Sequence, residues 1–191
     1  MMLKAAKKPL KAKTSLRKKT IQPKLKKPRK YVPLAKKSIT ALVTEVDKVF
    51  SRYVRIRDSE RVGNSWYGKC ITCSKTGIVA YIDDDGKLRF TKGWDNGHFV
   101  GRGNWITRFE EENNNLQCSM RCNKMRSGEY VKYKAALRDK YGDGVAEKLE
   151  KMADEQPART YRFKREELLQ IYKDSVEQVK FYVEYEKVLD N

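Results

Sequence analysis

Residues 94–123 have the sequence WDNGHFVGRGNWITRFEEENNNLQCSMRCN and hold two of the four cysteines and the only histidine of the chain. The cysteines form two close pairs, Cys70 with Cys73 and Cys118 with Cys122, and 44 residues separate the pairs. Two such pairs supply the four thiolates of a tetrahedral structural zinc site. The spacing therefore predicts one structural Zn²⁺, and the alternative is a set of free, buried thiols.

The single histidine, His98, lies between the two cysteine pairs and follows Asp95-Asn96-Gly97. A nuclease needs a base that is partly unprotonated near neutral pH, and imidazole meets that need. It also needs a divalent cation beside the scissile phosphate, held by oxygen ligands. A lone histidine is more often structural, so the position of His98 is what favours a catalytic role.

A longer series of motifs surrounds this histidine. In chain order they are Cys70-x2-Cys73, Asp95-x-Gly97-His98, Arg102-Gly103, Arg108-Phe109, Asn113, Gln117-Cys118, Cys122-Asn123 and Ser127-Gly128. The series resembles the NinG (Rap) family of phage recombination proteins and, more broadly, the HNH or ββα-metal endonucleases. The resemblance covers about residues 38–150.

The resemblance implies a structure-specific DNA endonuclease that cleaves branched recombination intermediates such as Holliday junctions or D-loops. It implies that His98 is the general base that activates water and that Asn113 orients it. It also implies that Asp95 and Asn123 ligate a catalytic Mg²⁺ or Mn²⁺.

The resemblance also assigns Arg102 and Arg108 to phosphate binding, because guanidinium pairs with phosphate bidentately. The alternative is that both are ordinary surface charges. The chain departs from the family pattern in having three residues between Cys118 and Cys122 instead of two, and Asn115 where a histidine is often found. The additional residue would shift the start of the helix that carries Asn123.

The positive charge of the chain is concentrated at its start. Residues 1–37 carry 15 of the 43 lysines and arginines and no acidic residue, whereas the remaining 154 residues hold 28 basic and 25 acidic side chains. This basic, proline-containing segment cannot bury enough apolar surface to fold alone, so we expect a disordered tail with salt-sensitive affinity for nucleic acid. A mitochondrial presequence would favour arginine over lysine.

Composition excludes other classes of protein. Mean hydropathy is −0.81, and no run of about 18 apolar residues could span a membrane. The start of the chain has no apolar core of a signal peptide, and four cysteines are few for a disulfide-rich secreted protein. We therefore expect a cytoplasmic protein, in the bacterial host if it is phage-encoded, that binds DNA and no membrane.

Apolar spacing and turn residues predict the following elements. A helix capped by Ser38 runs to about Arg57, and a β-hairpin has strands 78–82 and 87–91 around a turn at 83–86. Two further short strands are expected within 94–108, around a loop at 101–104. Helices are expected at 121–128, 129–141, 145–154 and 164–189, and the last has the core stripe Leu168, Tyr172, Val176, Val179 and Val183.

The predicted fold class is α+β, with a ββα-metal core (HNH or treble-clef-like) held together by zinc, flanking helices and a disordered basic N-terminal tail. The predicted domains are the tail at 1–37, the helix and nuclease core at 38–128 and a helical region at 129–191. Four aromatic side chains near His98 are expected to fill the core rather than to stack on DNA bases: Trp94, Phe99, Trp105 and Phe109.

Two other functions remain open at this point. The chain could be a non-catalytic zinc-finger protein that binds nucleic acid, or an HNH nuclease that cuts linear duplex DNA. A homodimer and recombination proteins are possible partners, and the sequence does not decide between them.

Overall fold

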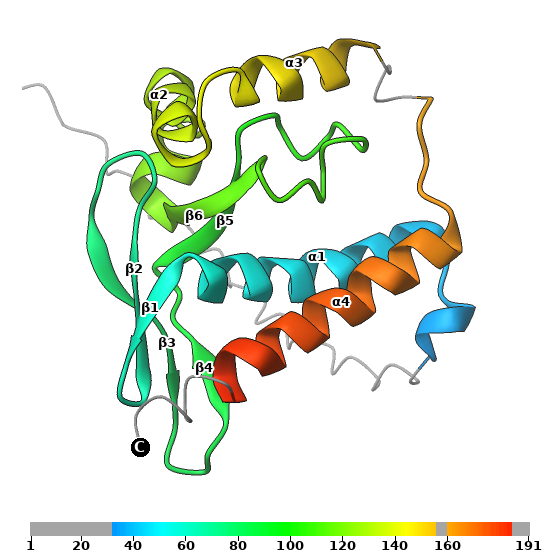
Figure 1. The fold of residues 1–191 in the computed structure, drawn as a ribbon. Helices are drawn as coiled ribbons and strands as arrows, with labels where there is room; N and C mark the ends of the chain where they lie inside the picture. The colour runs from blue at the N-terminus through cyan, green and yellow to red at the C-terminus, as the bar shows by residue number, and fades with distance from the viewer. Residues whose placement is uncertain (1–31, 156–159, 185–191) are drawn as a thin grey trace, which may run out of the picture. The chain divides into compact units, whose positions relative to one another are not determined.

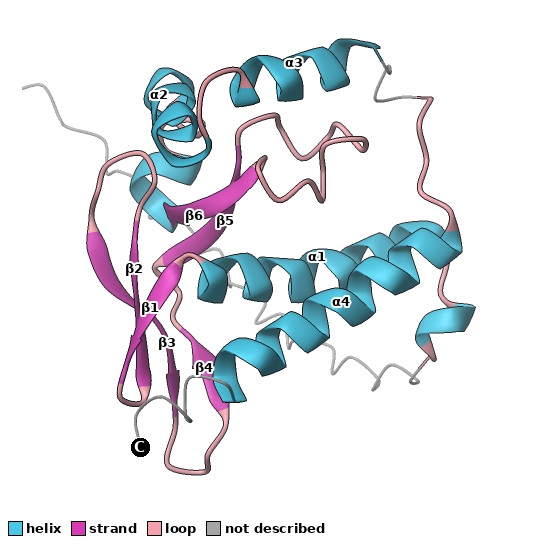
Figure 2. Cartoon of the chain, viewed as in Figure 1, coloured by secondary structure: helices cyan, strands magenta, loops and turns pink. Residues whose placement is uncertain are grey.

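The computed structural model describes residues 32–155 and 160–184, all within one compact unit, Val32–Asn191. Helices and strands alternate with irregular segments in a mixed α+β arrangement (Figure 2). Of the predicted basic tail, residues 1–31 lie outside the described residues. Residues 32–37 are ordered, contrary to the prediction. They include the 3-10 turn η1 (Leu34–Lys36), whose Leu34 packs in a hydrophobic core, and Arg165 Nη1 donates to the Lys37 carbonyl over 2.7 Å.

Helix α1 (Ile39–Arg57) begins and ends where the sequence predicts. The Ser38 hydroxyl accepts a hydrogen bond from Ala41 N, which satisfies one of the free N–H groups at the helix start. At the other end, Arg57 Nη2 donates to the Asn114 carbonyl over 2.6 Å, and Asp58 Oδ2 accepts from Leu116 N over 2.9 Å. These bonds fix the end of α1 to strand β6.

Four strands form an antiparallel sheet in the order β1-β2-β3-β4. They are β1 (Ser59–Val62), β2 (Ser65–Lys69), β3 (Thr76–Ile82) and β4 (Leu88–Phe90). The predicted hairpin is confirmed as β3 and β4, and in its turn Asp83 Oδ1 accepts from Lys87 N over 2.8 Å. The β1–β2 hairpin was not predicted. Its signal was the two-residue loop Gly63-Asn64, where Gly63 has φ +59°, a value that favours glycine.

A second, two-stranded sheet pairs β5 (Trp94–His98) with β6 (Asn114–Cys118). The prediction of two strands within 94–108 is therefore wrong, because the partner of β5 lies beyond residue 113. The segment 99–113 forms an irregular loop whose backbone is bonded by side chains. Asn113 Nδ2 donates to the Val100 and Thr107 carbonyls, and Asn113 Oδ1 accepts from Val100 N. These bonds replace a strand ladder.

Three further helices and one short turn complete the described fold: η2 (Ser119–Lys124), α2 (Tyr130–Tyr141), α3 (Val145–Glu155) and α4 (Arg165–Glu184). The helix predicted at 121–128 is instead the π-helical η2, which begins and ends earlier. Helices α2 and α3 pack with Phe99, directly after β5. The predicted end of α4 at residue 189 lies outside the described residues.

Helices α1 and α4 lie side by side (Figure 1), and residues from both pack in three hydrophobic clusters. Leu168 of α4 is fully buried against Leu42, Val43 and Val46 of α1, as the predicted stripe requires. Trp94 and Phe99 are buried, and Trp105 and Phe109 pack on Phe163, so the core role expected for these four aromatics is confirmed. Helix α4 was predicted to belong to a separate helical region, 129–191. It packs instead on α1, which was predicted to belong to the nuclease core.

Candidate active site and metal centre

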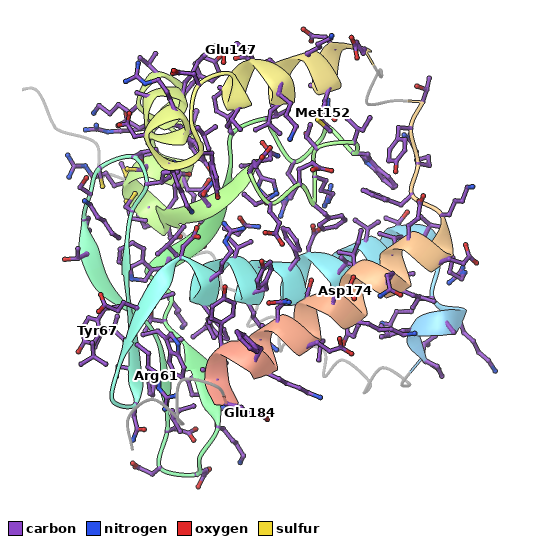
Figure 3. All side chains as sticks on the ribbon, in the orientation of Figure 1. Arg61, Tyr67, Glu147, Met152, Asp174 and Glu184 are labelled. Carbon is purple, nitrogen blue, oxygen red and sulfur yellow. The ribbon has the colours of Figure 1, made fainter. Side chains whose placement is uncertain are left out.

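The four cysteines come together where the β2–β3 turn meets the end of β6, and sulfur atoms gather at this turn in Figure 3. Their Sγ atoms all lie within 4.8 Å of one another, and Cys73 Sγ is 3.8 Å from Cys118 Sγ. Four sulfurs at about 2.3 Å from a tetrahedral Zn²⁺ lie roughly 3.8 Å apart. The cluster therefore fits the predicted zinc site, with Cys70, Cys73, Cys118 and Cys122 as ligands.

Hydrogen bonds around Cys70 favour its thiolate, the form that binds metal. Burial raises the pKa of Cys70, but bonds from the Thr72 hydroxyl and from Cys118 N, 3.3 and 3.4 Å from its Sγ, outweigh burial and lower the pKa to about 6. In contrast, burial raises the pKa of Cys122 to about 12. Four thiolates this close need a cation to offset their charge.

The additional residue between Cys118 and Cys122 is accommodated by the π-helical turn η2. Met125 N donates to the Met120 carbonyl over 2.9 Å, a bond that spans five residues and so admits one residue more than an α-helical turn. This wide turn places Cys122 in the sulfur cluster and Asn123 beside Asp95. The unusual spacing therefore does not displace Asn123.

A polar hollow of about 560 Å³ brings together the predicted base and the two predicted ligands of the catalytic metal, whereas Asn113 and Arg108 do not line it. Asp95, Asn96 and His98 line it from β5, and Asn123 lines it from η2. The remaining lining residues are Ser51, Gly101, Arg102, Lys124, Ser127 and Gly128. The fold thus brings together residues from α1, from β5 and the loop after it, and from η2 and the residues that follow η2.

Asp95 and Asn123 are in direct contact, because Asn123 Nδ2 donates to Asp95 Oδ2 over 2.9 Å. Neighbouring ligand oxygens of an octahedral Mg²⁺, at about 2.1 Å from the metal, lie roughly 3 Å apart. A half-turn of the Asn123 amide exchanges its nitrogen for its oxygen and gives that spacing. In the arrangement observed, Lys124 Nζ lies 3.9 Å from the same Asp95 Oδ2, so the carboxylate already faces one positive charge.

His98 is half-buried and is held neutral. Burial and the charges of Arg102 and Arg108 together lower the pKa of its imidazole to about 4, although Asp47 and a hydrogen bond to the Arg108 backbone oppose them. The imidazole is thus unprotonated at neutral pH. Its position on β5 is fixed from α2, since the Tyr133 hydroxyl donates to the Gly97 carbonyl over 3.0 Å.

The two predicted phosphate-binding arginines differ in their surroundings. Arg108 makes a two-bond ion pair with Asp47 of α1, at 3.0 and 2.6 Å, and its Nη1 donates to the Arg102 carbonyl. Arg102 itself lines the hollow. Arg102 is therefore the better placed of the two to meet a phosphate, and Arg108 holds the loop against α1.

Asn113 and Asn115 are both fully buried and do not line the hollow. The three side-chain hydrogen bonds of Asn113 hold the backbone of the loop that follows His98. Asn113 could therefore orient His98 only indirectly, through the position of that loop. Asn115 Oδ1 accepts from Lys140 Nζ and the Tyr141 hydroxyl of α2, at 2.7 and 2.9 Å. Asn115, where the family often has histidine, thus connects β6 to α2.

Gly97 is required by close packing at the site. A Cβ atom there would lie 2.2 Å from Gln117 Oε1, whose Nε2 donates to the Gly128 carbonyl over 2.8 Å. The path of β5 beside the segment that carries Ser127 and Gly128 thus depends on this glycine.

The family model described as Bacteriophage Lambda NinG protein matches residues 1–182. The chain belongs to the NinG family. The predicted resemblance to NinG is confirmed, and membership suggests a function related to phage recombination. Neither the curated proteins nor the solved structures yielded a match.

Helix α1 of this NinG chain contributes to the site in a way that the sequence motifs do not predict. Asp47 and Ser51 lie one helical turn apart on α1 and line a small pocket together with His98. No local motif marks them, because their role depends on how α1 packs against a strand more than 40 residues away. Over residues 32–155 and 160–184, no helix combines the length and the apolar character needed to cross a bilayer.

Proposed function

We propose that this chain is a metal-dependent endonuclease that hydrolyses a phosphodiester bond in branched DNA, such as a Holliday junction or D-loop. The observation that carries the proposal is the shared hollow in which Asp95, Asn123 and the neutral imidazole of His98 meet. Family membership supports a substrate that arises in recombination.

In the proposed reaction, His98 takes a proton from a water molecule that attacks the phosphorus atom. The hydrogen bond to the Arg108 backbone occupies one ring nitrogen, so the other accepts the proton. Asp95 and Asn123 would hold a Mg²⁺ or Mn²⁺ ion, which when bound offsets the negative charge that develops on the leaving oxygen. Arg102 pairs with a non-bridging phosphate oxygen and so orients the scissile group.

The zinc site has a structural part in this proposal. Cys122 is adjacent to Asn123, and Cys118 ends the strand that pairs with β5. A zinc ion on the four thiolates would therefore fix the two halves of the proposed active site relative to each other.

The proposal is tested by incubating the full chain with a synthetic four-way junction and Mg²⁺, beside a linear duplex of the same sequence. We expect preferential incision of the junction, and a loss of about 10²–10⁴-fold in rate in His98→Gln. Asn64→Ala, an exposed asparagine away from the hollow, is the control and should cut normally. Full activity of His98→Gln would reject His98 as the base, and preferential duplex cutting would favour the linear-DNA nuclease.

A non-catalytic DNA-binding protein is the second candidate. It is favoured by Lys124 Nζ, which lies 3.9 Å from Asp95 and already supplies a positive charge there. Junction binding without incision, with either Mg²⁺ or Mn²⁺, would support this second candidate.

A further inference from the structure

A second hollow, of about 620 Å³, adjoins the proposed active site. One wall is a face of α1, the other is β4, and Arg102 of the loop after β5 lies at the edge shared with the active-site hollow. Half of its ten lining residues are basic: Lys48, Arg52, Arg55, Arg89 and Arg102. Because Ser51 and Arg102 line both hollows, the basic hollow leads directly to the one that contains His98.

The α1 wall is built by helical periodicity. Thr44, Lys48 and Arg52 follow one another at intervals of four, so they lie on one face of the helix. Lys48 and Arg52 are exposed, whereas the opposite face of α1 is buried against α4. The charges on this wall are thus not required for the core.

Acidic groups balance only part of the positive charge of this hollow, because Lys48 pairs with Glu45 and Arg89 pairs with Asp83. Its one acidic lining residue, Asp47, is already bonded twice to Arg108. In the part of the chain that the structure describes, the guanidinium groups of Arg52 and Arg102 have no hydrogen bond or ion pair. These two guanidinium groups are therefore the part of the hollow's positive charge that no acidic side chain offsets.

Two of the guanidinium groups are held beside the same aromatic ring. The Cζ atoms of Arg52 and Arg55 lie 5.9 and 4.7 Å from the centroid of Phe90. Arg55 Nη2 donates to the Thr91 carbonyl over 2.6 Å, while its buried Nε has no hydrogen-bond partner within the described chain. Phe90 and Thr91 thus keep two like charges close together, an arrangement that an anion between or beside them stabilises.

We propose that this basic hollow binds the phosphodiester backbone of a DNA strand beside the phosphate that is cut. The inference rests on the proposed endonuclease function. From Lys48 to Arg55 the helix rises about 10 Å, and successive phosphates of one strand advance roughly 3.4 Å along a duplex axis. The wall is therefore long enough to follow about three phosphates, after which Arg102 leads the strand to His98.

The test measures DNA binding by the full chain in EDTA, so that no incision occurs. The variant Lys48→Gln/Arg52→Gln is compared with Lys173→Gln/Lys180→Gln, which removes the same charge from exposed positions of α4. Binding of the junction is followed by fluorescence anisotropy over a range of salt concentrations, and thermal melting checks that both variants are folded.

We expect Lys48→Gln/Arg52→Gln to bind about tenfold more weakly. The slope of log affinity against log salt concentration should also be smaller by about 1.4–1.8, since each lost phosphate contact removes 0.7–0.9. The α4 variant should keep the affinity and slope of the unmodified chain. Equal affinity and slope in the two variants would overturn the inference. Polyglutamate, an acidic peptide, is measured in the same assay. If Lys48→Gln/Arg52→Gln loses polyglutamate binding but keeps DNA binding, the inference is overturned in favour of an acidic protein segment.

The binding assay separates this inference from the proposed function. If the unmodified chain binds DNA but never cuts it, the endonuclease proposal fails, while the difference between the two variants still decides whether the hollow holds DNA. If the unmodified chain cuts DNA and the two variants bind DNA equally well, only the inference about the basic hollow fails.

Discussion

The charges around His98 control its protonation at the scale of single residues. Burial, with Arg102 and Arg108 nearby, lowers the pKa of the imidazole to about 4, and Asp47 offsets only part of this effect. In the unfolded chain the pKa of histidine is about 6.5. At a pH between these two pKa values, His98 therefore binds a proton in the unfolded chain but not in the folded chain.

This difference predicts a pH-dependent loss of stability. As pH falls from 7 to 5, protonation of the unfolded state at His98 should lower the free energy of unfolding by about 2 kcal/mol. Urea unfolding at pH 7, 6 and 5 measures it, and His98→Gln should lack this part of the decrease. Parallel pH profiles for the two proteins would contradict a buried, neutral His98.

Individual residues differed in how far the sequence could predict them. The cysteine spacing was sufficient for the metal cluster, because two close thiol pairs have few other uses in a chain of this kind. The motif likewise placed Asp95, His98 and Asn123 in one hollow. The Asp47–Arg108 pair was not predictable, because its partners are 61 positions apart and many carboxylates could have faced that arginine.

At the scale of elements, the π-helical turn η2 joins the metal cluster to the proposed active site. Its additional residue lies between Cys118 and Cys122, and Met120, 62% exposed, is the position most easily removed. Deletion of Met120 restores the common two-residue spacing, so we expect about one zinc per chain, as in the unmodified protein.

The same deletion should lower the rate of DNA incision about 100-fold, because it turns Asn123 away from Asp95. Metal analysis and the junction assay measure the two effects, and Met120→Ala, which keeps the chain length, should retain both zinc and activity. Normal incision after the deletion would show that the wide turn is not needed to place Asn123.

Elements with a strong local signal were predicted well, and those defined by distant pairing were not. Helix α1 has both a cap and a regular apolar stripe, and both ends were placed correctly. Strand β6, by contrast, is Asn-Asn-Leu-Gln-Cys, a polar sequence with no alternation, and all five residues are buried. In the loop 99–113, asparagine side chains make the hydrogen bonds that a neighbouring strand would otherwise make. Secondary-structure propensities do not predict hydrogen bonds of this kind.

At the scale of the whole molecule, α4 stabilises the site from a distance by packing on α1. Leu168 is fully buried at that contact, so Leu168→Ala should lower the free energy of unfolding by about 2–5 kcal/mol. Chemical denaturation measures the loss, and Val131→Ala, at a side chain that is 79% exposed, should cost less than about 0.5 kcal/mol. A loss at Leu168 as small as at Val131 would mean that α4 adds little to the fold.

Helix α1 turns one side toward α4 and the other toward the His98 and arginine-lined hollows. Each residue of an α-helix is rotated by about 100° from the one before. A single inserted residue between Leu42 and Asp47 would therefore swing Asp47 away from Arg108 and move the apolar side chains out of the core in the same step. The number of residues in this helix is thus constrained twice, by folding and by chemistry, whereas the exposed β3–β4 turn carries neither constraint and is free to change in length.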